Sequence, residues 1–528
     1  MHKFLRLLSA CIISAVLQHT ASSQSLGINT TGAAAANSSI LDVSSTDKGL
    51  LVPRMNKSQR NAIGSPATGL LVYQNSPDST GFYYYDGAKW GWMGTLNGNL
   101  DTLAWKRKGN AGTNPAVNFI GTTDNQPLNF RQNNKWIGKL NSATSNYFIG
   151  AGAGENNTGT DNVIIGDSTG FNSSGTTYSV LIGRNAATNN TGWWSIIIGN
   201  SAGRDNQAIG SVFIGSTAGM HNVSGYGNSF IGDNAGRDNI SGSENTFLGY
   251  MAGNKNLNNH YNSFLGYASG FNNTGGDANT FIGNATGFSN TTGDNNVFLG
   301  TSAGYLNTIS SNNTMVGYNA AASYNPGSDN TFLGANSDAN ATGIYNSAGI
   351  GSAVLISASN QVRIGNSATT SIGGYANWTN ISDGRIKTNI HENVPGLTFI
   401  NKLRPVTYTL DLKAADGIMH KQAIKDKDGK VVPVSSFEKN ALYQKEQIVY
   451  TGFIAQEVEE AAKQVNFNFS GVDAAKNDKD LYGLRYAEFV VPLVKAVQEQ
   501  NKLINDLRTR IELLEEHNKL LKQSIKNN

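Results

Sequence analysis

Short apolar pairs recur along the middle of the chain at a nearly constant spacing. Each copy reads Asn-x-[Phe/Val]-[Ile/Leu]-Gly-x-x-Ala-Gly and is followed by a turn rich in Asn and Gly. The glycines after the pairs lie 16 or 17 residues apart, and 17 apart in every step after Gly215. A copy this short cannot fold alone, so the pattern predicts stacked repeats. The glycines are Gly150, Gly166, Gly183, Gly199, Gly215, Gly232, Gly249, Gly266, Gly283, Gly300, Gly317 and Gly334.

Each apolar pair predicts a short strand with one apolar residue on either face, because neighbouring strand residues point in opposite directions. In Phe247-Leu248, for example, one side chain lines the inside of a coil and the other needs cover from another copy of the chain. The glycines suit turns with positive φ, and the asparagines suit ladders along the stacking axis. The expected fold is therefore mainly β, with a parallel β-roll or β-solenoid over residues 148–378.

The repeats resemble a known family of surface proteins. The copy at residues 245–253 reads Asn-Thr-Phe-Leu-Gly-Tyr-Met-Ala-Gly. It is similar to the head repeats of trimeric autotransporter adhesins, whose period is usually shorter. The resemblance implies a trimer of left-handed parallel β-rolls.

The pattern changes near Trp378, where glycine becomes scarce and Lys, Glu and Leu increase, which indicates a domain boundary. At the end of the chain, apolar residues alternate at spacings of three and four, which predicts a coiled coil over residues 490–526. One heptad position holds Val490, Val497, Ile504, Ile511, Asn518 and Ile525, and the other holds Leu493, Gln500, Leu507, Leu514 and Leu521.

The number of helices in this coiled coil is open from the residues alone. β-Branched residues at one position with Leu at the other favour two strands. Gln500 and Asn518 weaken that preference, and the repeats favour a homotrimer. A helix that packs on its own domain is the other interpretation.

Four motifs identify the region between the repeats and this helix. They are Ser-Asp-Gly-Arg-Ile-Lys at 382–387, Leu-Arg-Pro-Val-Thr-Tyr at 403–408, Gly-Phe-Ile-Ala-Gln-Glu-Val at 452–458 and Leu-Arg-Tyr at 484–486. In this order they resemble the intramolecular chaperone domain of phage endosialidases and tail spikes, the peptidase S74 family. The resemblance implies an α+β domain at 380–525 that trimerises the upstream fibre and then cuts itself off. Ser382 would be the nucleophile and Lys387 its base.

The chemistry of this pair is reasonable. A serine hydroxyl needs a base, and a lysine serves once burial lowers its pKa. The five-residue spacing separates Ser382 and Lys387 on a strand or a helix, so folding or a neighbouring subunit must bring them together. Without the resemblance, Ser-Asp-Gly indicates a turn or a helix cap. The side of Ser382 on which the chain is cut is open.

The N-terminal part lacks the repeat and has a different residue pattern. Within residues 24–100, runs at 41–45, 48–55, 69–73 and 81–87 predict the strands of a β module that resembles the N-terminal region of secreted tail-fibre-like proteins. The aromatic run 82–85, with Trp90 and Trp92, indicates either internal packing or a sugar-binding platform. Residues 101–147 are interpreted as a transition module.

The first 23 residues predict a secretory signal peptide. Lys3 and Arg6 precede an apolar stretch, and small residues end at Ser23, after which we expect cleavage. Cys11, the single cysteine, lies inside this segment; lipidation there is the alternative. The mature chain would therefore hold no disulfide.

Composition limits the partners. Only 15% of the 528 residues are charged, and the formal net charge of +3 gives no pull towards nucleic acid. No later apolar stretch is long enough to predict a membrane span. The seven histidines are dispersed, so we expect no metal site, and no motif predicts a cofactor.

These patterns together predict a secreted or cell-surface trimeric fibre, adhesin-like, with a surface glycan or a protein as its ligand. Its only chemistry would be its own cleavage at Ser382. The alternative is a tail-spike-like protein that binds or degrades glycans, and degradation needs paired carboxylates. The Gly-x-Ser-x-Gly segments at 166–170, 199–203 and 300–304 share one phase of the repeat, which favours turns over catalytic elbows.

Overall fold

The computed structural model describes residues 25–94, 111–114, 116–420, 431 and 434–527. The segment predicted as a signal peptide lies outside the described residues. The chain divides into two compact units, Met1–Gly121 and Thr122–Asn528. The predicted fold class is confirmed: the protein is mainly β, with a long parallel β-solenoid, a small α/β region and a long C-terminal helix.

The first unit holds two small sheets. One pairs β1 and β2 in parallel. The other has the order β3-β4-β5-β6, with β3 parallel to β4 and the rest antiparallel. A run predicted as strand, 48–55, forms one only at its end, and helix α2 follows, capped by Asn56. The elements are β1 (Leu26–Asn29), β2 (Leu41–Ser44), β3 (Arg54–Asn56), α2 (Lys57–Asn61), β4 (Leu71–Ser76), β5 (Gly81–Tyr85) and β6 (Trp90–Met93).

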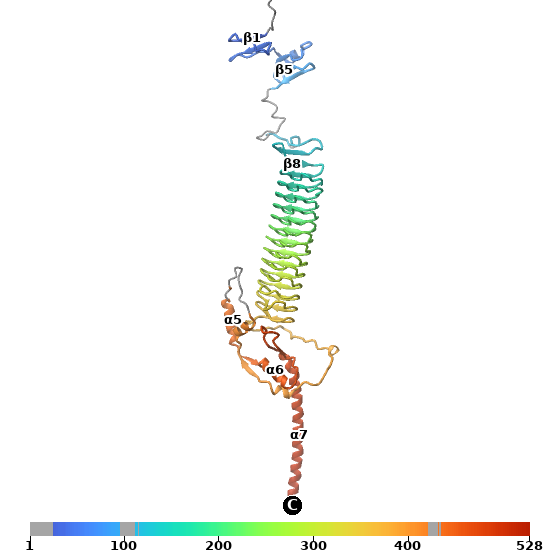
Figure 1. The fold of residues 1–528 in the computed structure, drawn as a ribbon, viewed down its shortest axis with the longest axis vertical. Helices are drawn as coiled ribbons and strands as arrows, with labels where there is room; N and C mark the ends of the chain where they lie inside the picture. Colours follow the sequence, from blue (N-terminus) through green and yellow to red (C-terminus); the bar gives the residue numbers. More distant parts are fainter. Residues whose placement is uncertain (1–24, 95–110, 115, 421–430, 432–433, 528) are drawn as a thin grey trace, which may run out of the picture. The chain divides into compact units, whose positions relative to one another are not determined.

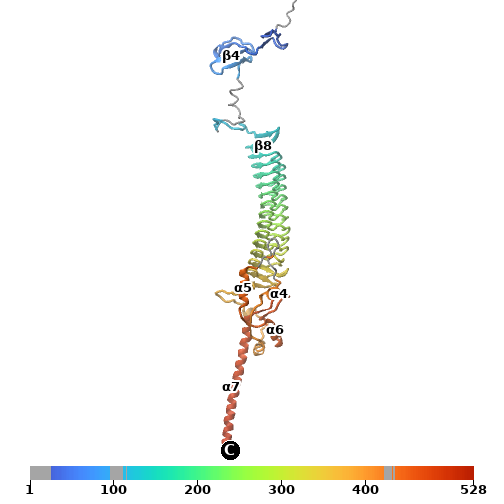
Figure 2. The same cartoon turned by 90° about the vertical axis from the view of Figure 1, so that its left-hand side faces the viewer.

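The second unit is built around one sheet of sixteen strands. It opens with the antiparallel strands β7 (Leu128–Gln132), β8 (Lys135–Asn141) and β9 (Asn146–Ile149). The first two lie inside the region predicted as a transition module, and β9 crosses its end at residue 147. From β9 on, all pairs in this sheet are parallel, each coil contributes one short strand to it, and the strands stack as a ladder in both views (Figures 1 and 2). The ladder continues through β10 (Val163–Ile165), β11 (Val180–Ile182), β12 (Ile196–Ile198), β13 (Val212–Ile214), β14 (Ser229–Ile231), β15 (Thr246–Leu248), β16 (Ser263–Leu265), β17 (Thr280–Ile282), β18 (Val297–Leu299), β19 (Thr314–Val316), β20 (Thr331–Leu333), β22 (Ala348–Ile350) and β24 (Val362–Ile364).

The middle residues of the strands from β13 to β20, all Phe except Met315 in β19, form a buried column. The parallel register places Phe247 opposite Phe264 and Phe264 opposite Phe281. Their ring centroids lie 4.9 and 4.8 Å apart, with nearly parallel planes. Each buried ring contributes about 1.5–3 kcal/mol relative to exposure. The column therefore stabilises the coils within a single chain; its phenylalanines are Phe213, Phe230, Phe247, Phe264, Phe281, Phe298 and Phe332.

The last residue of each strand lies on the outer face, as the alternation predicts. Leu248, Leu265 and Leu299 each keep slightly more than 40% of their surface exposed. They stand above one another because the strands are in register. A single chain thus carries an uncovered apolar row along its solenoid.

Asparagine ladders hold the turns of successive coils together, also as predicted. The side-chain amide of Asn273 donates to the Asn256 side chain at 3.1 Å, and Asn290 donates to Asn273 at 2.8 Å. Each amide also donates within its own turn, as from Asn273 to the Gly276 carbonyl at 2.7 Å. These side chains are fully buried, so the ladder satisfies polar groups that would otherwise be costly.

Glycine after the apolar pair is required by a close approach between coils. Gly249 has φ +140, and a Cβ there would lie 2.4 Å from the Gly266 carbonyl oxygen. Side chains with a Cβ rarely adopt this backbone conformation. The repeat period is therefore tied to a backbone contact as well as to the aromatic column.

The C-terminal region follows the last coil. Its described residues form two antiparallel pairs, β25–β26 and β27–β28, and five α-helices, with a small apolar core of Phe399, Val458, Ala461, Ala462, Phe469 and Phe489. The remaining elements are β21 (Asp338–Ala339), β23 (Leu355–Ile356), η2 (Gly384–Ile386), α3 (Leu397–Ile400), β25 (Val406–Tyr408), α4 (Leu412–Ile418), α5 (Ser436–Glu446), β26 (Tyr450–Gly452), α6 (Ala455–Gln464), β27 (Val472–Asp473), β28 (Gly483–Leu484), η3 (Tyr486–Phe489) and α7 (Val490–Lys526).

Helix α7 is 37 residues long and leaves its apolar seam in solvent. Its first turns contact α3 and bury Pro492 and Ala496. From residue 500 to residue 527 every side chain is exposed, including the predicted heptad residues Ile504 and Leu507. The alternative of a helix packed along its own domain therefore fails for most of α7 in the single chain.

Candidate cleavage site

The segment that leads to Ser382 is an exposed strip of chain. After the last solenoid strand, residues 370–382 are all exposed and form neither strand nor helix. Backbone that lacks regular hydrogen-bonded structure is accessible to attack. A nucleophile placed at the end of this strip therefore lies beside chain that can be cut.

A single tight turn shapes the site. Asp383 caps the short helix η2, since its carboxylate accepts from the Arg385 amide at 2.8 Å. The Arg385 guanidinium binds the same carboxylate through both Nε and Nη2. This side-chain contact holds the pKa of the Asp383 carboxyl below its usual range. Asp383 and Arg385 thus fix the turn and leave Ser382 and Lys387 at its two ends.

The turn brings the predicted pair together. The Lys387 ammonium Nζ donates to the Ser382 hydroxyl at 2.7 Å. Neither a strand nor a helix would give this contact at a spacing of five, but one 3₁₀ turn between the two residues folds the chain back. The separation suits proton transfer between a base and a serine nucleophile.

Both side chains are exposed in the single chain. A lysine that works as a base must lose its proton, and burial in an apolar setting favours that loss. The contact of the pair is therefore present in one chain, whereas both side chains remain in solvent there.

The other motifs build the support of this domain. Arg404 forms a two-pronged ion pair with Glu457 on α6. The Tyr486 hydroxyl accepts from the Phe453 amide at 3.1 Å. These contacts join the second, third and fourth motifs to one another, and none of them involves Ser382. They are structural features of the scaffold.

An exposed aromatic pair on the solenoid is a candidate binding feature that the sequence analysis missed. Tyr178 and Trp194 lie two residues before their strands, with ring centroids 6.5 Å apart and planes 24° from parallel. Both have left-handed backbone, with φ +55, and more than half of each side chain is exposed. Later coils place Asn295 and Asn312 at this position, and Asn tolerates such a φ. The signal was two consecutive coils with a bulky aromatic residue at this position, which is otherwise mostly Asn, Asp, Gly or Ala; Tyr261 is a further exception.

The N-terminal aromatic run contains both buried and exposed rings. Tyr83 is buried and stacks under the Arg60 guanidinium at 4.1 Å. Phe82 and Tyr84 point to the other face of β5 and are exposed. Tyr83 accordingly serves internal packing.

Comparison with known proteins gives two family matches, each over part of the chain. Residues 382–466 match the family described as the chaperone of endosialidase. Residues 27–109 match the family described as the phage tail like trimerisation region. No curated protein and no solved structure matches the chain. The first match confirms the resemblance of the C-terminal domain, and together with the β-solenoid the two matches fit a trimeric fibre.

The N-terminal match, to a family of trimerisation regions, falls on the segment predicted as a β module resembling that of secreted tail-fibre-like proteins. Families of this kind indicate an extracellular or surface fibre. Among the described residues, no helix has the length and hydropathy needed to cross a bilayer. Within the same residues, no three His, Cys, Asp or Glu side chains gather into a possible metal site.

Proposed function

We propose that the protein is a secreted or cell-surface homotrimeric fibre, adhesin-like, whose C-terminal domain aligns the three chains and then removes itself by cleavage next to Ser382. The observation that carries the proposal is the 2.7 Å contact between Lys387 Nζ and Ser382 Oγ at the end of an exposed strip of chain. The match of residues 382–466 to the endosialidase chaperone family supports it.

The proposed reaction is an acyl transfer followed by hydrolysis. The Lys387 amine accepts the proton of the Ser382 hydroxyl, and Oγ attacks the carbonyl carbon of a peptide bond beside Ser382. A C–O bond forms, the C–N bond breaks, and the departing amine takes the proton. Water then cleaves the ester and restores the hydroxyl. Burial of Lys387 by a neighbouring subunit would make the reaction wait for assembly.

Alignment explains why a fibre of this design needs such a domain. Coils that all look alike specify their register weakly. The exposed seam of α7 would bind the same seam of two other chains and set all three at one end, from which the coils can associate. Loss of the domain then leaves a fibre that resists unfolding kinetically.

Removal of the nucleophile tests the cleavage. Ser382→Ala and Lys387→Gln should each leave the secreted chain at full length on a denaturing gel, while wild type gives two fragments. Thr379→Ala is the matched control, because it removes an exposed hydroxyl from the same strip without touching the pair. Unchanged fragments in Ser382→Ala would refute the assignment of the nucleophile.

Native mass spectrometry of the Ser382→Ala protein tests the fibre itself. Three copies of the full chain in one particle are expected, because residues 27–109 match a family of trimerisation regions and the exposed seam of α7 is free to bind further copies. A stable single chain would contradict the proposal, since the row of Leu248, Leu265 and Leu299 and the seam of α7 would then remain in water.

The aromatic pair favours a glycan as the ligand, which is the second candidate function. Exposed, nearly parallel rings offer flat apolar faces to a sugar ring. Trp194→Ala should abolish binding on a glycan array, whereas Tyr318→Ala, at another exposed aromatic residue, should retain it. A hydrolysis assay on the bound glycan separates an adhesin from a glycan-degrading enzyme.

A further inference from the structure

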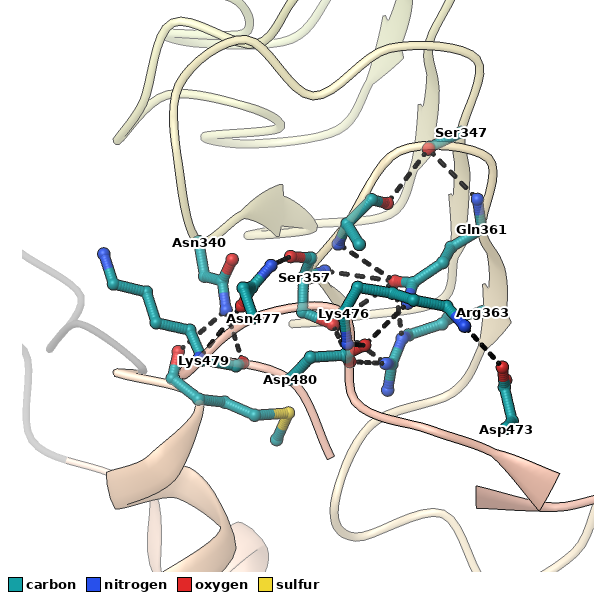
Figure 3. A network of polar contacts seen from close by, with 12 residues as sticks. Asn340, Ser347, Ser357, Gln361, Arg363, Asp473, Lys476, Asn477, Lys479 and Asp480 are labelled. Atoms are coloured by element: carbon teal, nitrogen blue, oxygen red, sulfur yellow. Dashed lines mark hydrogen bonds and ion pairs between the residues drawn. The ribbon is translucent and has the colours of Figure 1, made fainter. Parts of the chain in front are cut away.

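A buried polar network joins the last coils of the solenoid to the C-terminal domain (Figure 3). On the solenoid side it uses Asn340 and residues in or beside β23 and β24, namely Ser357, Gln361 and Arg363. On the other side it uses the segment that connects β27 to β28, residues 474–482. The network is polar, and its parts are far apart in the sequence.

Asp480 is the centre of the network. Its side chain is only 3% exposed. Its carboxylate accepts from Arg363 Nη2 at 2.7 Å, from Gln361 Nε2 at 3.3 Å and from the Ser357 hydroxyl. The Lys476 amide also donates to it, at 3.0 Å. Arg363 donates in addition to the Ser357 hydroxyl and to Gln361, so the groups around Asp480 hold one another in place.

The carboxylate is charged at neutral pH. Burial alone would raise the pKa of Asp480, but the bonds from Ser357 and the Lys476 amide, together with the charge of Arg363, hold this pKa below its usual range. A buried ion pair of this kind is strongly destabilised when one partner is removed, because the other charge stays buried without compensation.

The same segment satisfies backbone groups at the end of the solenoid. Asn477 donates its side-chain amide to the Ser357 carbonyl at 2.8 Å. In the opposite direction, Asn340 donates to the Lys479 carbonyl at 2.9 Å. Repeat structures need a cap at the last coil, where no further coil follows. Residues 474–482 provide such a cap.

The two sides of the network lie on opposite sides of the proposed cut in the sequence. Asn340, Ser357, Gln361 and Arg363 precede Ser382, whereas residues 474–482 follow it. Cleavage beside Ser382 breaks one peptide bond in an exposed segment and leaves every hydrogen bond and ion pair of the network intact. After the cut, the same contacts join two separate molecules.

We propose that residues 474–482 act as a latch, centred on Asp480, that binds the cleaved C-terminal fragment to the end of the fibre, so that cleavage and release are separate steps. The partner is the end coil of this chain's own solenoid, through Ser357, Gln361 and Arg363. This inference rests on the proposed cleavage. In a trimer, three latches act together, and their combined hold exceeds that of one.

The test distinguishes cleavage of the chain from retention of the cleaved fragment on the fibre. Wild type is run on a native size-exclusion column and the fibre peak on a denaturing gel; both fragments should be found in that peak. Asp480→Ala should still be cut, but at least about 90% of its small fragment should elute separately, since the loss of a buried ionic partner costs several powers of ten in binding. Asp478→Ala is the matched control: this neighbouring carboxylate is exposed, and its fragment should stay with the fibre.

A second form of the experiment does not depend on self-cleavage. A recognition site for an added protease is inserted between Gly373 and Gly374, in the exposed strip, of the full Ser382→Ala chain. After that protease cuts, the fragment should stay bound, and Asp480→Ala should release it. Failure of wild type to cut itself would refute only the proposed cleavage. Free elution of the Asp480-containing fragment after protease cutting would overturn the latch.

A milder substitution, Asn477→Ala, tests the latch if the Asp480→Ala chain does not fold. Asn477→Ala removes one hydrogen bond from an exposed residue and should speed release about tenfold. A release rate equal to that of Asp478→Ala would overturn the latch as well.

Discussion

The solenoid and helix α7 deal with their apolar residues in opposite ways. In the solenoid, each Phe of the aromatic column is buried by the coils above and below it in the same chain. In α7, the heptad residues Ile504 and Leu507 are about half exposed, and no described part of the chain covers them. One region can hold a structure by itself, whereas the other has an apolar seam that only further copies can bury.

This difference indicates an order of assembly. The seam of α7 is a continuous stripe that binds identical stripes with a defined register, as heptads do. The outer row of the solenoid is half-exposed and repeats every coil, so it adds area without fixing the register. Association should therefore begin at α7, and the solenoids should come together afterwards.

The largest effect should come from charges in the α7 seam. Leu507→Asp together with Ile511→Asp places two carboxylates per chain in a buried seam, at about 3 kcal/mol or more each. The secreted chains should then fail to trimerise in analytical ultracentrifugation. Lys502→Asp with Thr509→Asp puts the same charges on the opposite face of the helix and should leave the trimer intact. If the seam variant still trimerises, α7 does not start assembly.

Truncation of the aromatic column should come next. Phe264→Ala removes a ring stacked between two others and should destabilise the solenoid by about 3–5 kcal/mol. Leu265→Ala truncates the outer face of the same strand. It should lower the free energy of unfolding by less than about 0.5 kcal/mol in a single chain. Once a neighbouring chain covers Leu265, the loss should be about 2 kcal/mol or more. Denaturant unfolding measures both. Equal costs in trimeric and α7-disrupted protein would mean that the outer row is never covered.

A pair of glycines tests the backbone contact between coils. Gly249→Ala combines a positive φ with a Cβ 2.4 Å from the next coil and should cost about 2–4 kcal/mol in denaturant unfolding. Gly210→Ala shares the positive φ but has open space around its Cβ, so it should cost about 1 kcal/mol. A similar loss of stability in both variants would show that the cost at Gly249 comes from backbone strain and not from the contact with the next coil.

The effect of a buried acid in the last coils is seen only as a pH slope. Asp338 is almost fully buried in β21, and this burial raises its pKa to about 7. Its folded pKa lies above the unfolded one, so the folded chain binds more protons between about pH 4 and 7, and stability falls as pH rises through that window. The slope is at most about 1.4 kcal/mol per pH unit. Asp338→Asn should flatten it in melting curves between pH 5 and 8, while a Phe264→Ala chain keeps the wild-type slope.

Much of the solenoid could be predicted from the sequence because its signal is periodic. The spacing of Gly249 and Gly266 gave the coil length, and the alternation in Phe247-Leu248 gave the inner and outer rows. The asparagine ladders followed from the same period. Long-range contacts in a repeat are contacts between equivalent residues, so local pattern and tertiary packing coincide.

The candidate site and its surroundings could be predicted only in part. Ser382 and Lys387 came from a resemblance, and their contact depends on a 3₁₀ turn that no periodicity indicates. The latch around Asp480 joins residues more than a hundred positions apart, with no repeating signal. The aromatic pair Tyr178 and Trp194 was visible only as a departure from small turn residues, which a search for the common pattern overlooks.

The equivalence of the coils also has a genetic consequence. From Gly215 to Gly300 each copy contributes the same strand, the same column position and the same ladder rung. Gain or loss of one whole copy, 51 nucleotides in the coding sequence, would therefore leave every remaining contact type intact. Unequal recombination could thus lengthen or shorten the solenoid in steps of about 4.8 Å, the distance between paired strands, without the need for a new fold.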